Sequence, residues 1–210
     1  MRIACLHTAQ VHVATFNALF TEKAPDAQLW HMVREDLLAQ AQVGGLEIVA
    51  EPLFNAMAEM AEADAILCTC STLGPLVDQM GNPKAIRIDR PVMEAAVQAG
   101  PKPLLALCLE STRTASLGLL TQAATPEITP TVHMCEGAWA HFEAGDMGGF
   151  AEAIAASVRA AVDGHDCVVL GQASMQVAEP LLADLGIPIL SSPALAVDAA
   201  IGWSLGVGAS

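Results

Sequence analysis

Residues 64–75 read DAILCTCSTLGP: a short apolar run leads into two cysteines, two hydroxyl residues and a Gly-Pro pair. The apolar run is typical of a buried strand, and Gly74-Pro75 of the start of the next helix. In open parallel sheets, ligands bind beyond the carboxyl ends of the strands. We therefore expect Cys70 to be an exposed thiol near a helix N-terminus, where the helix dipole lowers a thiol pKa. Cys68, inside the apolar run, is interpreted as a packed side chain.

On both sides of this stretch, short β-rich runs alternate with Ala-rich helical runs. Strands are expected at residues 2–7, 28–33, 64–69, 85–89, 103–109, 127–134, 166–171 and 187–191. Helices are expected at residues 13–22, 48–63, 74–80, 91–100, 149–164, 178–186 and 193–206. Strands that alternate with helices indicate an α/β fold with parallel sheets and helical crossovers.

The second half of the chain repeats the first at an offset of 102 residues. Identical residues at this offset include Asp64 and Asp166, His31-Met32 and His133-Met134, Pro91 and Pro193, and Gly100 and Gly202. With the shared order of strands and helices, they indicate an internal duplication. We predict two pseudosymmetric halves, each a mostly parallel sheet flanked by helices, with the active site in the cleft between them. The first half is expected at 1–100, with the C-terminal helix at about 193–210 as a candidate to pack back on it, and the second at 101–192.

Charge and composition exclude several function classes. The 210 residues include 9 basic and 23 acidic side chains, a net charge of −14, so the chain lacks the basic surface that binds nucleic acid or anionic membranes. No stretch of about 18 residues is free of charges and strong breakers, and the N-terminus reads as a first strand rather than a signal peptide. Six cysteines without a secretory signal indicate reduced thiols in a cytoplasmic protein.

The segment DAILCTCSTLG resembles the first-half motif of the aspartate/glutamate/hydantoin racemase superfamily, in which a strand beginning with Asp runs into Ala-Cys-Asn-Thr. Cys70-Ser71-Thr72 falls on the Cys-Asn-Thr of that motif, whose cysteine is one of two catalytic thiols. DCVVLGQASM at 166–175 resembles the second-half motif, and the similarity extends over nearly the whole chain. The resemblance implies an active site between two α/β halves, a small carboxylate substrate and no cofactor. Members of the superfamily often form dimers, which makes a second copy of this chain a candidate partner.

The second catalytic cysteine of the superfamily has no counterpart here. At the offset of 102, Cys70 falls on Gln172, and residues 71–72 fall on Ala173 and Ser174. A glutamine side chain donates and accepts hydrogen bonds but cannot act as a base or nucleophile. We therefore expect Cys70 to be the single catalytic thiol, with Gln172 orienting the substrate or stabilising a developing enolate.

Residues at the end of the first strand of each half complete the predicted site. Glutamate racemases end that strand in Asp-Ser near the first cysteine, whereas this chain has His7-Thr8. His7 is either a base or imidazolium partner of Cys70, or a residue that only caps the strand end through hydrogen bonds. Thr112 matches a threonine that binds the substrate carboxylate in the superfamily. The predicted catalytic residues are Cys70 and His7. The predicted substrate-binding residues are Thr8, Ser71, Thr72, Thr112, Gln172, Ala173 and Ser174.

Two other clusters of candidate ligands carry no metal signature. HMCEGAWAHFEAGD at 133–146 lacks the tight spacing of known zinc motifs, and the pair Cys68-x-Cys70 lacks further partners. We expect no metal site and interpret 133–146 as a strand end and loop. Without a phosphate-binding loop or a dinucleotide glycine signature, we expect no nucleotide either.

These observations favour a cofactor-independent enzyme that acts at a carbon α to the carboxylate of a small acid or amino-acid derivative. Three alternatives stay open. In the first, Cys70 shares racemisation with a different base, such as His7 or a bound water. In the second, the chain decarboxylates a malonate-type acid, as the one-thiol arylmalonate decarboxylases do with a cysteine of the second half. In the third, the chain binds small carboxylates without catalysis.

Overall fold

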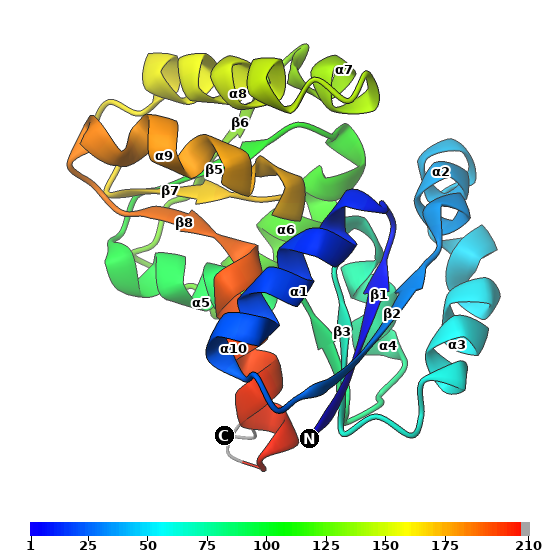
Figure 1. Cartoon of the computed structure of the whole chain (residues 1–210). Helices are drawn as coiled ribbons and strands as arrows, with labels where there is room; N and C mark the ends of the chain where they lie inside the picture. Colours follow the sequence, from blue (N-terminus) through cyan, green and yellow to red (C-terminus); the bar gives the residue numbers. More distant parts are fainter. Residues whose placement is uncertain (207–210) are drawn as a thin grey trace. The chain divides into compact units, whose positions relative to one another are not determined.

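The computed structural model describes residues 1–206 and divides into two compact units. The first unit consists of Met1–Ile88 together with the segment that begins at Pro193, and the second of Asp89–Ser192. Each unit has one four-stranded sheet with helices on both faces (Figure 1). No helix within residues 1–206 is long and apolar enough to cross a membrane.

All neighbouring strands are parallel, and the two sheets share one strand order. The first sheet has the order β2-β1-β3-β4 and the second β6-β5-β7-β8. The strands are β1 (Arg2–His7), β2 (Gln28–Val33), β3 (Ala65–Cys68), β4 (Ala85–Arg87), β5 (Pro103–Leu107), β6 (Thr131–Met134), β7 (Cys167–Leu170) and β8 (Ile189–Ser191). The central strands β3 and β7 are 102 residues apart (167 − 65 = 102). The predicted fold of two similar α/β halves is confirmed.

The α-helices are α1 (Val11–Lys23), α2 (Glu35–Gly44), α3 (Ala50–Glu59), α4 (Gly74–Gln79), α5 (Arg90–Ala99), α6 (Glu110–Ala123), α7 (Ala138–Glu143), α8 (Met147–Ala161), α9 (Glu179–Leu182) and α10 (Ser192–Ser204). Short 3-10 helices are η1 (Glu47–Val49), η2 (Ser71–Leu73), η3 (Ala173–Ala178) and η4 (Ala183–Leu185).

Three of these helices, α2, α6 and α7, lie where the sequence predicted no element. α6 reads ESTRTASLGLLTQA, and its Ser, Thr and Gly residues are weak helix formers. The helix buries Leu119 and Leu120 and packs on α5 and β5. Tertiary packing therefore stabilises a helix that local propensity does not indicate.

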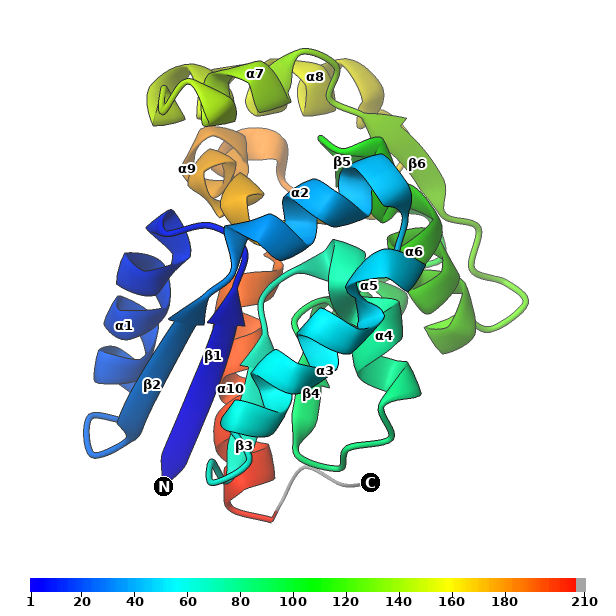
Figure 2. The ribbon, with the colours of Figure 1, turned by 90° about the vertical axis from the view of Figure 1, so that its right-hand side faces the viewer.

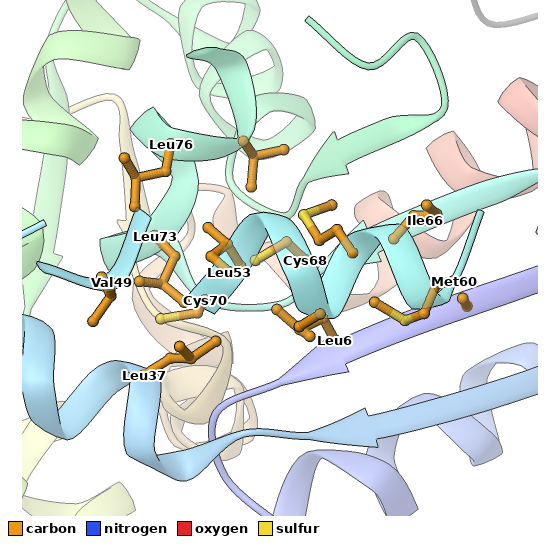
Figure 3. Packing of buried hydrophobic residues seen from close by; sticks show 14 of the residues in the cluster. Leu6, Leu37, Val49, Leu53, Met60, Ile66, Cys68, Cys70, Leu73 and Leu76 are labelled. Carbon is orange, nitrogen blue, oxygen red and sulfur yellow. The ribbon is translucent and has the colours of Figure 1, made fainter. Parts of the chain in front are cut away.

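Alternate residues of β1 and β3 face opposite sides of the first sheet. Leu6 and Cys68 face α2 and α3, where they share a buried cluster with Leu37 and Leu53 (Figure 3). The neighbouring residue His7 faces the other side, where its ring centroid lies 5.4 Å from that of Phe16 in α1. Figure 2 shows α1 on one side of β1 and β2, and α3 on the other.

The helix after the last strand of each sheet belongs to the other unit. α5 follows β4 but lies in the second unit, where it packs against β5, β7 and β8. α10 follows β8 but lies in the first unit, where Asp198 accepts hydrogen bonds from Lys23 Nζ at 2.8 Å. Each unit is therefore completed by a helix that follows the other unit's sheet.

Because α5 and α10 each belong to the other unit, the boundaries of the units differ from those expected from the sequence. The expected boundary lay after residue 100, whereas the second unit begins at Asp89, because α5 packs on its sheet. The C-terminal helix ends at Ser204, and residues 207–210 of its expected range lie outside the described residues.

The duplicated aspartates tie together the starts of neighbouring strands. Asp64, directly before β3, accepts a hydrogen bond at Oδ2 from the N–H of Arg2, the first residue of β1, at 2.8 Å. Asp166 Oδ2 accepts the corresponding bond from Lys102 N at 2.9 Å, before β7 and β5. These aspartates lie at the amino ends of the strands, so their repetition in the sequence reflects the architecture of the sheets rather than chemistry.

Candidate active site

Cys70 lies where β3 gives way to η2. Its backbone is extended (φ −117°, ψ 111°), and the chain then turns into the 3-10 helix. The side chain is only 6% exposed and belongs to the buried cluster that holds Leu37 and Leu73 (Figure 3). The expectation of an exposed thiol is therefore wrong, because side chains from α2, α3 and η2 enclose it.

The hydrogen bonds around Cys70 oppose the effect of this burial. Burial raises the thiol pKa, whereas hydrogen bonds from the Thr8 hydroxyl, from the Thr72 hydroxyl and N–H, and from the Leu73 N–H lower it. Burial dominates, so the pKa lies above its ordinary value, not below it as expected. The same donors nevertheless provide a ready set of partners for a thiolate.

Three predicted binding residues lie beside this thiol. Thr8 follows β1 directly and contacts Cys70 through its hydroxyl, which links the carboxyl ends of β1 and β3. Ser71 and Thr72 open η2 and are 4% and 3% exposed. The structure thus gathers Thr8, Cys70, Ser71 and Thr72 at one edge of the first sheet.

His7 lies on the opposite face of that sheet from Leu6 and takes part in a different network. His7 Nδ1 lies 2.8 Å from Thr69 Oγ1, and His7 Nε2 lies 2.8 Å from His31 Nδ1. Burial, together with His31 and His12, lowers the His7 pKa to about 3. The ring is therefore neutral at physiological pH and both nitrogens are occupied. The prediction that His7 is an imidazolium partner of Cys70 is therefore wrong. The neighbouring residue Thr8 contacts Cys70 instead.

One group of possible metal ligands lies close together within the described residues. Cys5 Sγ and ring nitrogens of His7 and His31 are within 4.8 Å of one another. Burial raises the pKa of Cys5 to about 12, so its thiol is protonated. The two imidazoles are hydrogen-bonded to each other, so a metal ion here would have to displace that bond and the thiol proton.

Gln172 repeats the local geometry of Cys70 in the second unit. Its backbone is also extended (φ −129°, ψ 143°), and it precedes η3 as Cys70 precedes η2. Gln172 Oε1 accepts hydrogen bonds from Cys108 N at 2.6 Å and from Leu109 N at 3.2 Å. These bonds fix the amide orientation, with the oxygen toward the end of β5 and the NH₂ group as the remaining donor.

The other predicted residues of the second unit lie at the same edge of its sheet. Ala173 and Ser174 open η3, and Thr112 lies in the first turn of α6. Thr112 Oγ1 donates a hydrogen bond to Leu109 O at 2.6 Å. Its hydroxyl hydrogen is therefore used within the helix start, so Thr112 is less suited to donate to a carboxylate than the resemblance implied.

Gly171 and Cys108 are two residues of this edge that the sequence reasoning missed. A Cβ at Gly171 would lie 2.4 Å from Leu107 Cδ2 and 3.1 Å from Ala106 O, so a larger residue before Gln172 would force Leu107 to move. Cys108 is the first residue after β5, and its N–H holds Gln172. Its position near the end of the strand predicted at 103–109 was the available signal.

Comparison with known proteins agrees with this architecture at the level of the fold. No protein-family model and no curated protein sequence matches the chain. Among solved structures, a glutamate racemase from Bacillus anthracis has a TM-score of 0.77 at 15% identity, over 99% of this chain and 84% of its own. Allantoin racemase from Klebsiella pneumoniae has a TM-score of 0.70 at 20% identity, over 100% and 90%. Arylmalonate decarboxylase has a TM-score of 0.62 at 13% identity, over 97% and 92%.

The two sheets, their shared order and the strand-end residues thus define an α/β protein of two similar units. Its fold is shared with glutamate racemase, allantoin racemase and arylmalonate decarboxylase.

Proposed function

We propose that the chain is a cofactor-independent enzyme that moves a proton at the carbon α to the carboxylate of a small acid or amino-acid derivative. The observation that carries this proposal is Cys70, a thiol at a strand end surrounded by four hydrogen-bond donors from Thr8, Thr72 and Leu73. Donors fixed around a sulfur stabilise the thiolate that acts as a base. The racemase fold of the chain supports the same reaction class.

In the proposed mechanism, the Cys70 thiolate removes the α-proton and the electron pair delocalises into the carboxylate group. Ser71, beside the thiol, binds the carboxylate, while the hydroxyl and N–H of Thr72 hold the Cys70 sulfur. In the second unit, the N–H groups of Cys108 and Leu109 orient the Gln172 amide and leave its NH₂ group as a donor for a polar oxygen of a ligand. Return of a proton to the carbanion completes the reaction.

Substitution of the two neighbouring cysteines tests this assignment. Cys70→Ala should lower turnover about 10³-fold or more, the usual scale for loss of a general base. Cys68→Ala is the matched control, because Cys68 is a fully buried residue of β3 and should leave the rate largely unchanged. Aspartate, glutamate, allantoin and phenylmalonate make up a first substrate panel. Equal loss of activity in both variants would refute the role of Cys70.

Decarboxylation is the second candidate function, favoured by the presence of Gln172 where a second thiol would otherwise stand. Loss of CO₂ generates the carbanion without a base, so a single thiol suffices to protonate it. Reaction in D₂O separates the two functions. Racemisation exchanges the α-proton and destroys chirality, whereas decarboxylation places deuterium on one face and releases CO₂.

If the chain instead binds small carboxylates without catalysis, we expect a different result from alkylation. Alkylation of Cys70 would then be no faster at neutral pH than alkylation of a model thiol, and small carboxylates would not protect it. An enzyme should show substrate protection of Cys70, which is measured by mass spectrometry of the peptide that contains it.

A further inference from the structure

The first residues beyond β5 and β6 are both cysteines, and the strand register places them opposite each other. Leu107 of β5 pairs with Met134 of β6, so Cys108 and Cys135 form the next pair. Cys135 N donates to Leu107 O at 2.7 Å, which extends the ladder past the end of β6. Neighbouring strands lie about 4.8 Å apart, a separation that a disulfide can span.

The two side chains also lie on the same face of the second sheet. Both belong to the apolar layer that faces α8, in which Phe150 is buried and Trp139 half-buried. Each thiol shifts the pKa of the other, as two neighbouring thiols do. Cys108 is partly exposed and Cys135 is buried, so a reagent in solution reaches the pair through Cys108.

We propose that Cys108 and Cys135 form a reactive dithiol site that reduces a low-molecular-weight disulfide and closes to an intramolecular disulfide. The proposal concerns the second unit alone and does not depend on the function proposed for Cys70.

The reaction balances in two exchange steps. The Cys108 thiol loses its proton and its sulfur attacks the disulfide RSSR, so that a Cys108–SR mixed disulfide forms and RS⁻ leaves. The Cys135 sulfur then loses its proton and attacks Cys108 Sγ, which releases the second RS⁻. Two protein thiols are oxidised, RSSR is reduced to two RSH, and the two thiol protons go to the leaving groups.

A polar chain behind Cys135 supports the second step. Ser157 helps to lower the pKa of Cys135, and Ser157 Oγ lies 2.8 Å from His133 Nε2. Contact with Cys108, and then with Ser157, lowers the pKa of Cys135, while the same contact with Cys135 and burial raise that of Cys108. The first proton to leave the pair is thus lost most readily from Cys135, and the Cys135 thiolate then accepts the Cys108 proton as the Cys108 sulfur attacks RSSR.

The isolated cysteines provide the contrast. Burial raises the pKa of Cys5 to about 12 and that of Cys167 to about 11, and Cys167 Sγ lies 3.8 Å from Ala96 O. Both of these thiols are buried, whereas Cys108 is partly exposed and lies beside a second cysteine. The Cys108–Cys135 pair therefore differs from them in its access to solvent and in the presence of a second thiol.

Oxidised glutathione, applied to the folded full-length chain, tests the proposal. We expect the protein to lose two hydrogens without retaining glutathione, as measured by intact mass. Trypsin cleaves after Arg113, which separates Cys108 from Cys135, so the new disulfide must join two peptides. The link must also form in a Cys70→Ser chain, which removes any contribution of the proposed catalytic thiol.

Three variants give the matched controls. Cys135→Ser should stop after the first step and keep glutathione on Cys108, whereas Cys108→Ser should leave Cys135 unmodified. Cys167→Ser should behave as the unsubstituted chain does. Circular dichroism and thermal melting establish that each variant is folded. A stable glutathione adduct on Cys108 of the unsubstituted chain, or no modification of Cys108 at all, would overturn the proposal.

Discussion

At the scale of single residues, Cys70 shows how burial and hydrogen bonding compete for one proton. Burial favours the neutral thiol, and four donors favour the thiolate without fully offsetting it. The resting site therefore holds a protonated thiol at neutral pH. Catalysis through a thiolate then requires that substrate binding or a higher pH removes this proton.

This balance predicts an alkaline pH dependence. If the thiolate is the active form, kcat/KM should rise with pH through and beyond the ordinary range of thiols, because the pKa of Cys70 is raised. Thr8→Val removes one donor to the thiolate and should lower kcat/KM at neutral pH about tenfold, since such bonds are worth about 1.5–3 kcal/mol. Thr8→Ser keeps the hydroxyl and serves as the control. A pH profile that is identical in Thr8→Val and in the unsubstituted chain would contradict this role.

Gly171 gives a second prediction at this scale, one of stability. Gly171→Ala forces a methyl group against Leu107 and the Ala106 backbone, and should lower the free energy of unfolding by about 1–3 kcal/mol. Gly118→Ala is the matched control, because nothing lies within 4 Å of its Cβ position in the interior of α6. That change should raise the free energy of unfolding by up to about 1 kcal/mol. Urea unfolding measures both, and equal effects would contradict the packing argument.

At the scale of elements, β1, β2 and α1 bring three histidines together. His7 and His31 are hydrogen-bonded, and the His12 ring centroid lies 6.2 Å from that of His7. Burial lowers the pKa of His12 to about 4, as burial and its neighbours lower that of His7 to about 3. These elements are therefore stable only while the histidines remain neutral.

This cluster predicts acid destabilisation of the first unit. Between an unfolded pKa of about 6.5 and these lower folded values, the unfolded chain binds more protons than the folded chain. The stability contributed by the cluster is therefore present above pH 6.5 and is lost as the pH falls toward 3. Each pKa unit corresponds to about 1.4 kcal/mol.

Urea unfolding at a series of pH values measures this effect. His12→Gln should weaken the dependence on pH, because it removes one of the buried histidines whose pKa is lowered. A pH dependence that is the same in His12→Gln and in the unsubstituted chain would contradict the assignment.

The elements also show what the sequence predicts and where it fails. The alternation of strands and helices and the 102-residue offset are properties of local sequence, and the structure confirms both. The burial of Cys70 depends on Leu37 and Leu53, which reach it from distant helices, and no local pattern encodes that contact. The partners of His7 were missed for the same reason, because strand pairing sets them.

At the scale of the whole molecule, the exchange of α5 and α10 makes the first unit discontinuous in sequence. A chain that ends at Ser192 lacks α10 and should lose stability in the first unit alone. Hydrogen exchange of β1 and β3 should accelerate about tenfold or more, while β5 and β7 keep their protection.

Asp198→Ala provides the control for this truncation. It removes the bond to Lys23, a partly exposed ion pair, and should cost less than about 1 kcal/mol. Equal acceleration of exchange in both sheets of the shortened chain would contradict the division into units.

The discontinuity of the first unit also sets an order of events during synthesis. Residues 1–88 leave the ribosome first, yet their unit lacks its last helix until the segment from Pro193 has been made. The second unit is continuous and has all of its residues by Ser192. The unit whose synthesis begins first is thus the last to be completed. If translation stalls or ends early, this incomplete first unit would be exposed to aggregation and proteolysis.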